Sequence, residues 1–180
     1  MELLSEVLAE IMTVMDKVDE KEIKSTIKLL NSGRRIFILG EGRSGLQGKA
    51  FAMRLMHIGF NVFVIGETIT PSVQTGDVLV AISGSGTTST TIELAEKAKK
   101  AGIKILGITS ERKSPLAEMA NEILIIPGAT KTGSGIKSIQ LLSSLFDQTL
   151  HITLDFICLL LSRERSISNE AAKKQHSNME

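Results

Sequence analysis

Five short apolar runs, most of them separated by helical segments, constrain the fold of this chain more than any other feature. The runs cover residues 35–39, 61–65, 78–82, 103–108 and 123–126, and the helical segments between them cover 46–58, 90–101 and 115–120. Strands that alternate with helices need crossover connections, and these produce a parallel sheet buried on both faces. The sequence therefore predicts an α/β fold, with a parallel sheet of five strands covered by helices on both sides.

Helices are also predicted at both ends of the chain. The first, over residues 3–18, has an apolar stripe, and the second stops at residues 31–33. The stripe consists of Leu4, Leu8, Ile11, Met15 and Val18. A long helix over 136–163 and a short one over 168–176 close the chain. We find no internal repeat or linker, so we expect one domain over 1–180, with helices 1–33 and 136–180 packing on the sheet or on partner subunits.

Composition excludes several classes of protein. The 180 residues carry a net charge of +1 and one Cys, so neither a strong drive toward nucleic acid nor a disulfide framework is expected. Trp and Tyr are absent, which argues against a stacking platform for single-stranded nucleic acid. The start resembles no secretory signal, and the apolar stretch 150–161 is shorter than the roughly 20 residues of a membrane span. We expect a cytoplasmic protein with no membrane partner, in which Cys158 is a small buried hydrophobe.

The most specific motif follows the third apolar run, where two glycines lie among seven Ser or Thr residues at 83–91. Glycine lets the backbone close around an anion, and the free N–H groups at a helix start point toward it. The loop has no Lys or Arg, which favours a single phosphate monoester held by neutral donors; the alternative is a Ser/Thr-rich turn with a helix cap. The expected phosphate ligands are Ser83, Gly84, Ser85, Thr87 and Thr88.

The loop after the first run, Gly40-Glu-Gly-Arg-Ser-Gly45, fits the GxGxxG pattern of dinucleotide sites. Glu67 lies where such sites place their ribose-binding acid, so a nucleotide stays an alternative. Two features favour a phosphosugar instead. Arg43 and Ser44 suit sugar hydroxyls, and the stronger anion cradle follows the third run. We therefore expect Gly42, Arg43 and Ser44 to contact a small phosphosugar.

Three motifs together resemble a known family. GEGRSGLQGKAFAMRLMHIGF (40–60), VIGETITP (64–71) and VLVAISGSGTT (78–88) are similar to the sugar isomerase (SIS) domain, and within it to the 6-phospho-3-hexuloisomerases. The resemblance implies a three-layer sandwich with a flavodoxin-like sheet. It also implies a homotetramer with sites shared between subunits, and no metal or organic cofactor. The implied reaction interconverts D-arabino-3-hexulose 6-phosphate and fructose 6-phosphate.

The chain departs from the family pattern in one segment. Where the family tends to read Pro-Met-Gly-Ser-Leu-Phe-Glu-Gln, residues 141–148 read Leu-Leu-Ser-Ser-Leu-Phe-Asp-Gln, so Asp147 replaces a Glu. If that acid is catalytic, its shorter reach could slow the reaction or change the substrate. The ending at 175–178, Gln-His-Ser-Asn, resembles the family's His-x-Asn-Leu.

The implied isomerisation needs a base that removes the C2 proton, a donor for the enediolate oxygen and a phosphate anchor. Four side chains are candidates for acid or base. Glu67 is otherwise a loop acid, Asp147 a helix-terminal acid, and His57 a helix C-cap. His176 is otherwise a surface histidine, and the family resemblance suggests that it acts in a neighbour's site. His151 and Asp155 resemble half a metal site without further ligands, so we expect no metal.

Two rival functions stay open. The first is a sugar-phosphate sensor that binds without turnover, although the helices before residue 34 lack the basic character of a DNA-binding segment. The second is isomerisation of another phosphosugar, because the same cradle serves many. The favoured function belongs to the ribulose monophosphate pathway of carbohydrate metabolism, in which formaldehyde is fixed or pentose phosphate is supplied.

Overall fold

The computed structural model describes residues 1–179 and contains one five-stranded sheet, in which every pair of neighbouring strands is parallel. The strands are β1 (Ile36–Gly40), β2 (Val62–Val64), β3 (Val78–Ile82), β4 (Lys104–Thr109) and β5 (Glu122–Ile125). Their order is β2-β1-β3-β4-β5, which is the flavodoxin-like order that the family resemblance implied. The chain leaves β1 in one direction to form β2 and later returns on the other side as β3. Ligands bind at such a switch point, beyond the carboxyl ends of the strands.

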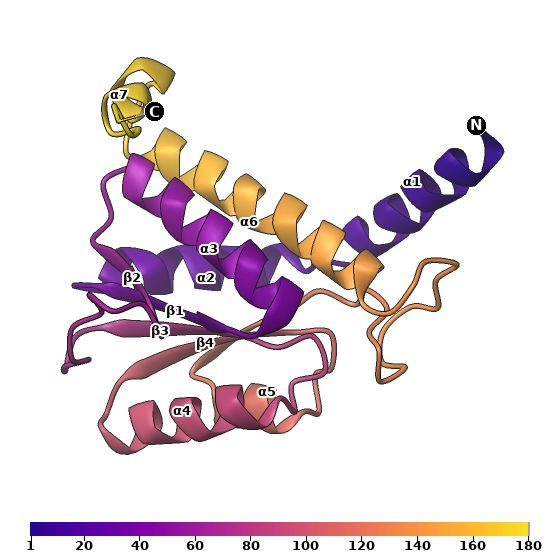
Figure 1. Cartoon of the computed structure of the whole chain (residues 1–180), viewed down its shortest axis with the longest axis horizontal. Helices are drawn as coiled ribbons and strands as arrows, with labels where there is room; N and C mark the ends of the chain where they lie inside the picture. Colours follow the sequence, from indigo (N-terminus) through magenta and orange to yellow (C-terminus); the bar gives the residue numbers. More distant parts are fainter. Residues whose placement is uncertain (180) are drawn as a thin grey trace.

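Helices cover both faces of the sheet, which confirms the three-layer prediction (Figure 1). The helices are α1 (Glu2–Met15), α2 (Glu20–Ser32), α3 (Gly42–His57), α4 (Ser89–Lys100), α5 (Pro115–Met119), α6 (Ser144–Glu164) and α7 (Asn169–Lys174). Helices α4 and α5 lie on one face, and α2, α3 and α6 lie on the other. Helices α3 and α6 run side by side, and both begin near the carboxyl ends of the strands.

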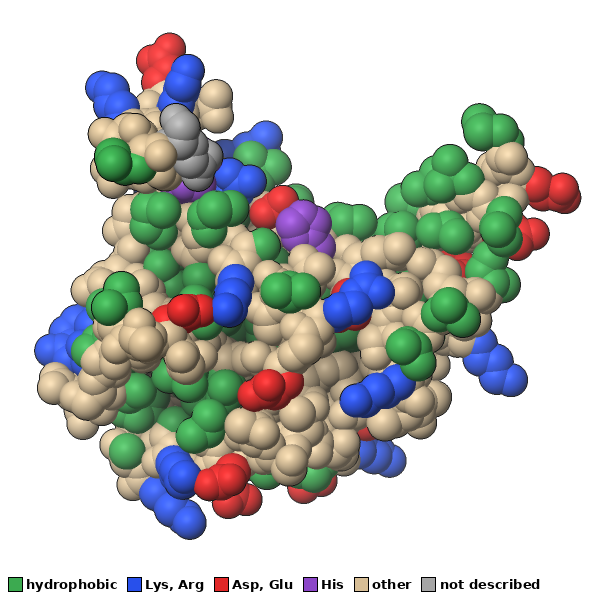
Figure 2. All heavy atoms as spheres, viewed as in Figure 1, with side chains coloured by type: hydrophobic (Ala, Val, Ile, Leu, Met, Phe, Trp, Pro, Cys, Tyr) green, Lys and Arg blue, Asp and Glu red, His purple; other side chains and the backbone are tan. Residues whose placement is uncertain are grey.

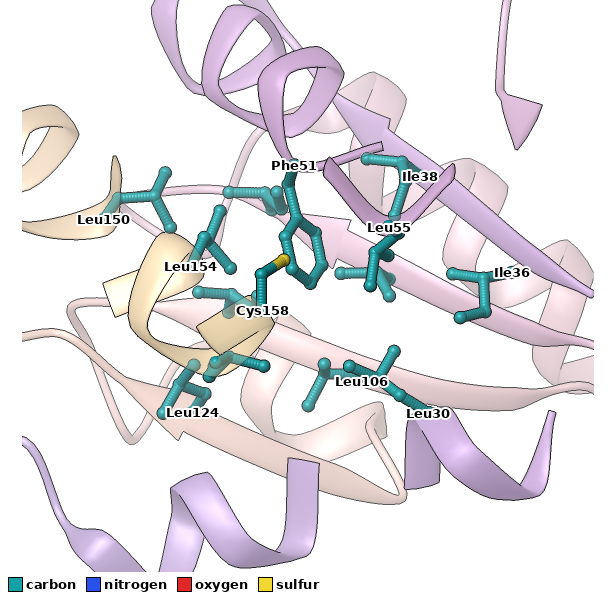
Figure 3. Close-up of a cluster of buried hydrophobic side chains, with 14 of the residues drawn as sticks. Leu30, Ile36, Ile38, Phe51, Leu55, Leu106, Leu124, Leu150, Leu154 and Cys158 are labelled. Carbon is teal, nitrogen blue, oxygen red and sulfur yellow. The ribbon is translucent and has the colours of Figure 1, made fainter. Parts of the chain in front are cut away.

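The core has one apolar cluster on each side of the sheet, because successive side chains of a strand point to opposite faces. In β1, Ile38 packs with the helices α2, α3 and α6, and Phe37 packs with α4 and α5. Cys158 of α6 points into the first cluster beside Phe51 (Figure 3). Burial and the nearby Asp155 carboxylate raise the pKa of the Cys158 thiol to about 12. The prediction that Cys158 is a small buried hydrophobe is confirmed.

Helix α6 corrects two expectations. It begins at Ser144 rather than at residue 136, and residues 126–143 form an irregular segment in which Gly133, Gly135 and Leu142 have positive φ. Its 21 residues are also long and apolar enough to cross a membrane, although the shorter stretch 150–161 suggested otherwise. More than half of its most apolar window is buried inside the protein, as expected of a core helix.

Two other helices differ from their predicted bounds. Helix α3 begins at Gly42 rather than at residue 46, so the glycine loop contributes Arg43 and Ser44 to the first helical turn. Helix α1 ends at Met15, and its apolar stripe is only partly buried: Leu4 and Leu8 are each 54% exposed. The first half of α1 therefore projects from the body of the chain (Figure 1).

Candidate active site

A cleft of about 480 Å³ lies beyond the carboxyl ends of β1 and β3, at the switch point of the sheet. Its walls come from the loop after β1, the loop after β3, and the chain that leads into α6. The lining residues are Glu41, Gly42, Arg43, Ser44, Ile82, Ser83, Gly84, Ser85, Thr88, Thr130, Lys131, Leu141, Leu142, Ser143, Ser144 and Asp147. Three of the four predicted acid–base candidates are not among them.

The loop after β3 is a compact turn ordered by its own hydroxyl groups. Ser83 Oγ lies 2.8 Å from Thr88 Oγ1 and accepts a hydrogen bond of 3.1 Å from the Gly86 amide. Gly86 has a φ of +67°, and a Cβ there would meet Ser114 Oγ at 2.1 Å. Thr88 is the N-cap of α4, but its side chain makes no capping hydrogen bond. The Thr88 side chain therefore does not occupy the first N–H groups of α4, and this arrangement suits an anion better than the simple helix cap.

The loop after β1 places polar side chains opposite this turn. Gly42 has a φ of +56°, and Gly45 packs so closely on the strand end that an added Cβ would lie 2.5 Å from the Gly40 carbonyl oxygen. Arg43 Nη1 donates to Ser144 Oγ at 3.0 Å, and Ser44 Oγ donates to Asp147 Oδ1 at 3.2 Å. The start of α3 is thus fastened to the start of α6 across the cleft.

Asp147 is the acid–base candidate that the fold brings into the cleft. It is 1% exposed, and its Oδ2 atom has no hydrogen-bond partner. Burial raises the pKa of the Asp147 carboxyl above its ordinary value, although Arg43 and the hydrogen bond from Ser44 oppose that shift. An acid with one oxygen that makes no hydrogen bond and a raised pKa is suited to accept a proton.

Sequence reasoning missed the wall that leads into α6. Lys131 brings a positive charge to the cleft, and its own amide donates to Ser143 Oγ at 3.2 Å. The β3 loop led us to expect a phosphate site made only of neutral donors, and that expectation left out the charge of Lys131. Leu141 and Leu142 line the same wall while 81% and 75% exposed. The one sign of this wall in the sequence was the isolated lysine between Thr130 and the glycines 133 and 135.

The other candidates lie elsewhere within the single chain. Glu67 is exposed beyond β2 and pairs with Lys49 Nζ at 2.6 Å. His57 is buried at the far end of α3, where its ring stacks on that of His176 at a centroid distance of 5.2 Å. Burial, followed by the nearby Arg54 and His176, lowers the pKa of His57. Thr87 is exposed and bonds to Ser85 Oγ rather than lining the cleft.

The suspected half metal site forms an exposed side-chain pair. His151 Nε2 lies 3.6 Å from Asp155 Oδ2, and Arg54 Nε lies 3.8 Å from Asp155 Oδ1. Within residues 1–179, no group of three or more His, Cys, Asp or Glu side chains could hold a metal ion.

A phosphate cradle at the switch point of a 2-1-3-4-5 sheet, with a buried acid beside it, defines an α/β protein built to bind a small phosphorylated ligand. The chain belongs to the SIS domain family, whose model matches residues 28–152. It is similar to the 3-hexulose-6-phosphate isomerase of Mycobacterium gastri, with 40% identity over 98% of this chain and 89% of that protein. The isomerase of the same name from Bacillus subtilis is 36% identical over 99% and 98% of the two chains.

A solved structure agrees over the whole chain. A hypothetical protein of Methanococcus jannaschii, for which a function of 3-hexulose-6-phosphate isomerase was inferred, superimposes with a TM-score of 0.86 at 31% identity. The superposition covers 100% of both chains. Fold and family therefore match the resemblance read from the three motifs.

Proposed function

We propose that this protein is a 3-hexulose-6-phosphate isomerase, which interconverts D-arabino-3-hexulose 6-phosphate and fructose 6-phosphate. Relatives with that name match it over nearly their whole length, which supports an enzyme rather than a sensor attached to another domain. One observation carries the chemistry: the Asp147 carboxyl lies buried at a cleft of about 480 Å³, and its Oδ2 makes no hydrogen bond and has Arg43 Nε 3.5 Å away.

The cleft offers one group for each part of the reaction. The start of α4 and the hydroxyls of Ser83 and Thr88 hold the phosphate, while Lys131 balances its charge. Asp147 takes the proton from C2 of the hexulose, and the carbonyl oxygen at C3 becomes part of a 2,3-enediolate. Arg43 stabilises the developing negative charge while the proton of the C2 hydroxyl passes to O3. Asp147 then returns its proton to C3 as the C2 carbonyl forms, which completes the transfer. A 3-ketose with its O6 phosphorylated cannot close a furanose ring through that oxygen, so this substrate binds in its open form.

The remaining candidates fit a site completed by a second subunit. Helices α3 and α6 expose Leu46, Met53, Met56, Ile152, Phe156 and Leu159. Figure 2 shows several hydrophobic side chains on the upper surface, the side on which α3 and α6 lie in Figure 1. Large apolar side chains exposed on two packed helices favour an interface there. We assign it to the subunit contacts of a homotetramer, in which Glu67 and the exposed His176 act as acid–base groups of a neighbour's cleft, while the buried His57 supports the ring of His176.

The same proposal sets the protein's wider context. The chain forms one SIS domain over 1–180 and works in the cytoplasm, within the ribulose monophosphate pathway. It acts there on the product of formaldehyde fixation, or in reverse to supply pentose phosphate.

The deciding experiment is NMR of fructose 6-phosphate with the protein in D₂O. Deuterium at C3, together with a growing 3-ketose signal, supports the 2,3-enediolate route. Deuterium at C1 instead indicates an aldose–ketose isomerase acting on the same cleft. Saturable binding without any exchange contradicts the proposal and favours the sensor. Light scattering in parallel tests the tetramer.

A further inference from the structure

The irregular segment 126–143 forms one wall of the cleft, and its two halves are held differently. The first half is closed by a contact of 2.6 Å between Thr130 Oγ1 and Ser134 Oγ and by the Ile136 amide, which donates to the Pro127 carbonyl at 2.8 Å. It is also joined to the end of β4, where Ser110 Oγ lies 2.9 Å from Ser134 Oγ. The second half leads through residues 138–140 to the wall residues and then into α6. Its position must be fixed from another part of the chain.

Glu10 of α1 supplies that fixation. Its Oε2 accepts from Ser138 Oγ at 2.6 Å and from Gln140 Nε2 at 3.2 Å, while its Oε1 accepts from the Ile139 amide at 2.7 Å. Within residues 1–179, every hydrogen bond that reaches 138–140 from elsewhere in the chain ends on Glu10. Burial would raise the pKa of this carboxyl, but the three hydrogen bonds lower it, so Glu10 is ionised at neutral pH.

Helix α1 is itself fixed where it carries Glu10. Val14 is fully buried in the core, and Thr153 Oγ1 of α6 lies 3.7 Å from Met15 Sδ. The first half of the helix is exposed, whereas the turn that follows Glu10 packs on α6. The carboxylate therefore joins the wall to the core rather than to a free arm.

Residues 138–140, which Glu10 fixes, lead directly into the wall of the cleft. Leu142 has a φ of +54°, a left-handed conformation that is costly for a residue with a Cβ and must be imposed by its surroundings. The next two hydroxyls hold the cationic side of the cleft: Ser143 Oγ accepts from the Lys131 amide, and Ser144 Oγ accepts from Arg43. Movement of 138–140 would thus displace the supports of both cations.

We propose that Glu10 is a positioning residue for the sugar-phosphate cleft, which it shapes through residues 138–144 without touching the substrate. The inference rests on the proposed function for its kinetic consequence only. A carboxylate suits this place because it only accepts hydrogen bonds, and all three partners donate. A glutamine would turn an NH₂ group toward at least one of these donors.

The test compares Glu10→Gln with Glu6→Gln, a control on the exposed part of the same helix. Hydrogen exchange at the Ile139 amide reports the contact directly, and calorimetry gives the Kd for fructose 6-phosphate. In Glu10→Gln we expect exchange at Ile139 to be at least about tenfold faster, Kd and KM to rise about tenfold, and kcat to fall by no more than about tenfold, because Arg43 loses a support but keeps its charge. That size corresponds to the loss of a charge-assisted hydrogen bond. The Glu6→Gln control should match the wild type.

A second variant approaches the contact from the loop. Ser138→Ala removes one donor, so it should move the same quantities in the same direction by a smaller factor. Unchanged exchange at Ile139, or faster exchange with unchanged Kd, would overturn the proposal. Wild-type protein that binds fructose 6-phosphate without isomerising it would refute the proposed function, while the exchange and Kd comparison would still decide the role of Glu10. Wild-type protein that does not bind the sugar phosphate would refute both.

Discussion

Arg43 Nε lies 3.5 Å from Asp147 Oδ2, yet the Asp147 carboxyl has a raised pKa. The arginine is largely exposed, whereas the carboxylate is almost completely buried, so loss of hydration outweighs the attraction of the nearby charge. The pair thus combines an acid that holds its proton more readily than usual with a nearby cation, which in the proposed mechanism stabilises negative charge on a bound sugar.

Asp147→Asn should remove the base and leave the cleft intact. We expect kcat to fall by about 10²–10⁴-fold, with KM for fructose 6-phosphate changed only a few-fold, since the phosphate cradle is untouched. Exchange of the C3 proton in D₂O measures the loss. Asp155→Asn is the control, because that acid is exposed on the same helix. Retention of normal exchange in Asp147→Asn would transfer the role of base to another group.

The raised pKa of Asp147 also predicts the acid limb of the pH profile. The base must be ionised, so kcat/KM should fall as the pH drops through a value above the ordinary pKa of Asp, about 3.9. The stability of the fold depends on the charge of Asp147 in the opposite sense. A carboxyl whose pKa is higher in the folded state stabilises the fold when protonated, and this contribution is lost as the pH rises through the folded-state pKa. Asp147→Asn should therefore have an unchanged or higher Tm at neutral pH, as calorimetry can check.

Lys131→Gln should weaken binding of the phosphosugar without affecting the chemical step. We expect KM to rise about tenfold at low salt with kcat within a few-fold, and the difference from wild type to shrink as salt rises, because the charge is exposed. Lys137→Gln is the matched control, since it lies on the same segment outside the cleft. Equal effects of the two substitutions would show that only the net charge of the loop matters.

The sheet could be predicted because each strand can be identified from a short stretch of the sequence. Buried parallel strands are continuous apolar runs, as in Val78–Ile82, and the glycine-rich loops that follow them mark the ligand edge. Motif order then identified the family, and with it the 2-1-3-4-5 strand order. Gly42, Arg43, Ser44 and most of the β3 loop line the cleft for the same reason, and their contacts with a phosphosugar stay predictions.

The features that the sequence did not reveal depend on contacts between residues that are far apart in the chain. The start of α6 was misplaced because no Pro or Gly separates residues 136 and 144, and only the hydrogen bonds to Glu10 and the positive φ of Leu142 break the helix. Lys131 was missed because its place in the cleft depends on the path of that segment. In the single chain, the cleft is not lined by Glu67, His57 or His176. Their roles in catalysis therefore stay predictions about an assembled oligomer.

Gly86 and Gly42 should respond differently to alanine, although both have positive φ. At Gly42 a Cβ meets no atom within 4 Å, so the cost is the left-handed backbone alone, about 1–2 kcal/mol. At Gly86 the new Cβ would also lie 2.1 Å from Ser114 Oγ, so Gly86→Ala should destabilise the protein by clearly more. Urea unfolding compares the two. Equal losses of unfolding free energy in the two variants would mean that the β3 loop moves to accommodate the new Cβ without a further loss of stability.

Asp77 is predicted to stabilise the end of the sheet opposite the cleft. It is 1% exposed and accepts from Arg35 Nε at 3.0 Å, from Arg35 Nη2 at 2.6 Å and from the Gln74 amide at 2.7 Å. Burial by itself would raise the pKa of Asp77, but these hydrogen bonds and the two arginine charges lower it. Asp77→Asn leaves a buried amide facing a guanidinium, and we expect Tm at neutral pH to fall by about 10 °C.

The pH dependence provides the sharper check on Asp77. Because its pKa is lower in the folded state, its stabilisation is complete above the unfolded-state value of about 3.9 and is lost as the pH falls through the folded-state pKa. The Tm difference between wild type and Asp77→Asn should therefore be largest at neutral pH and should shrink below pH about 4. Glu93→Gln is the control, since its pairing with Lys97 is exposed and its removal should leave Tm unchanged. A Tm difference that persists undiminished in acid would show that the amide's shape, rather than the lost charge, destabilises the variant.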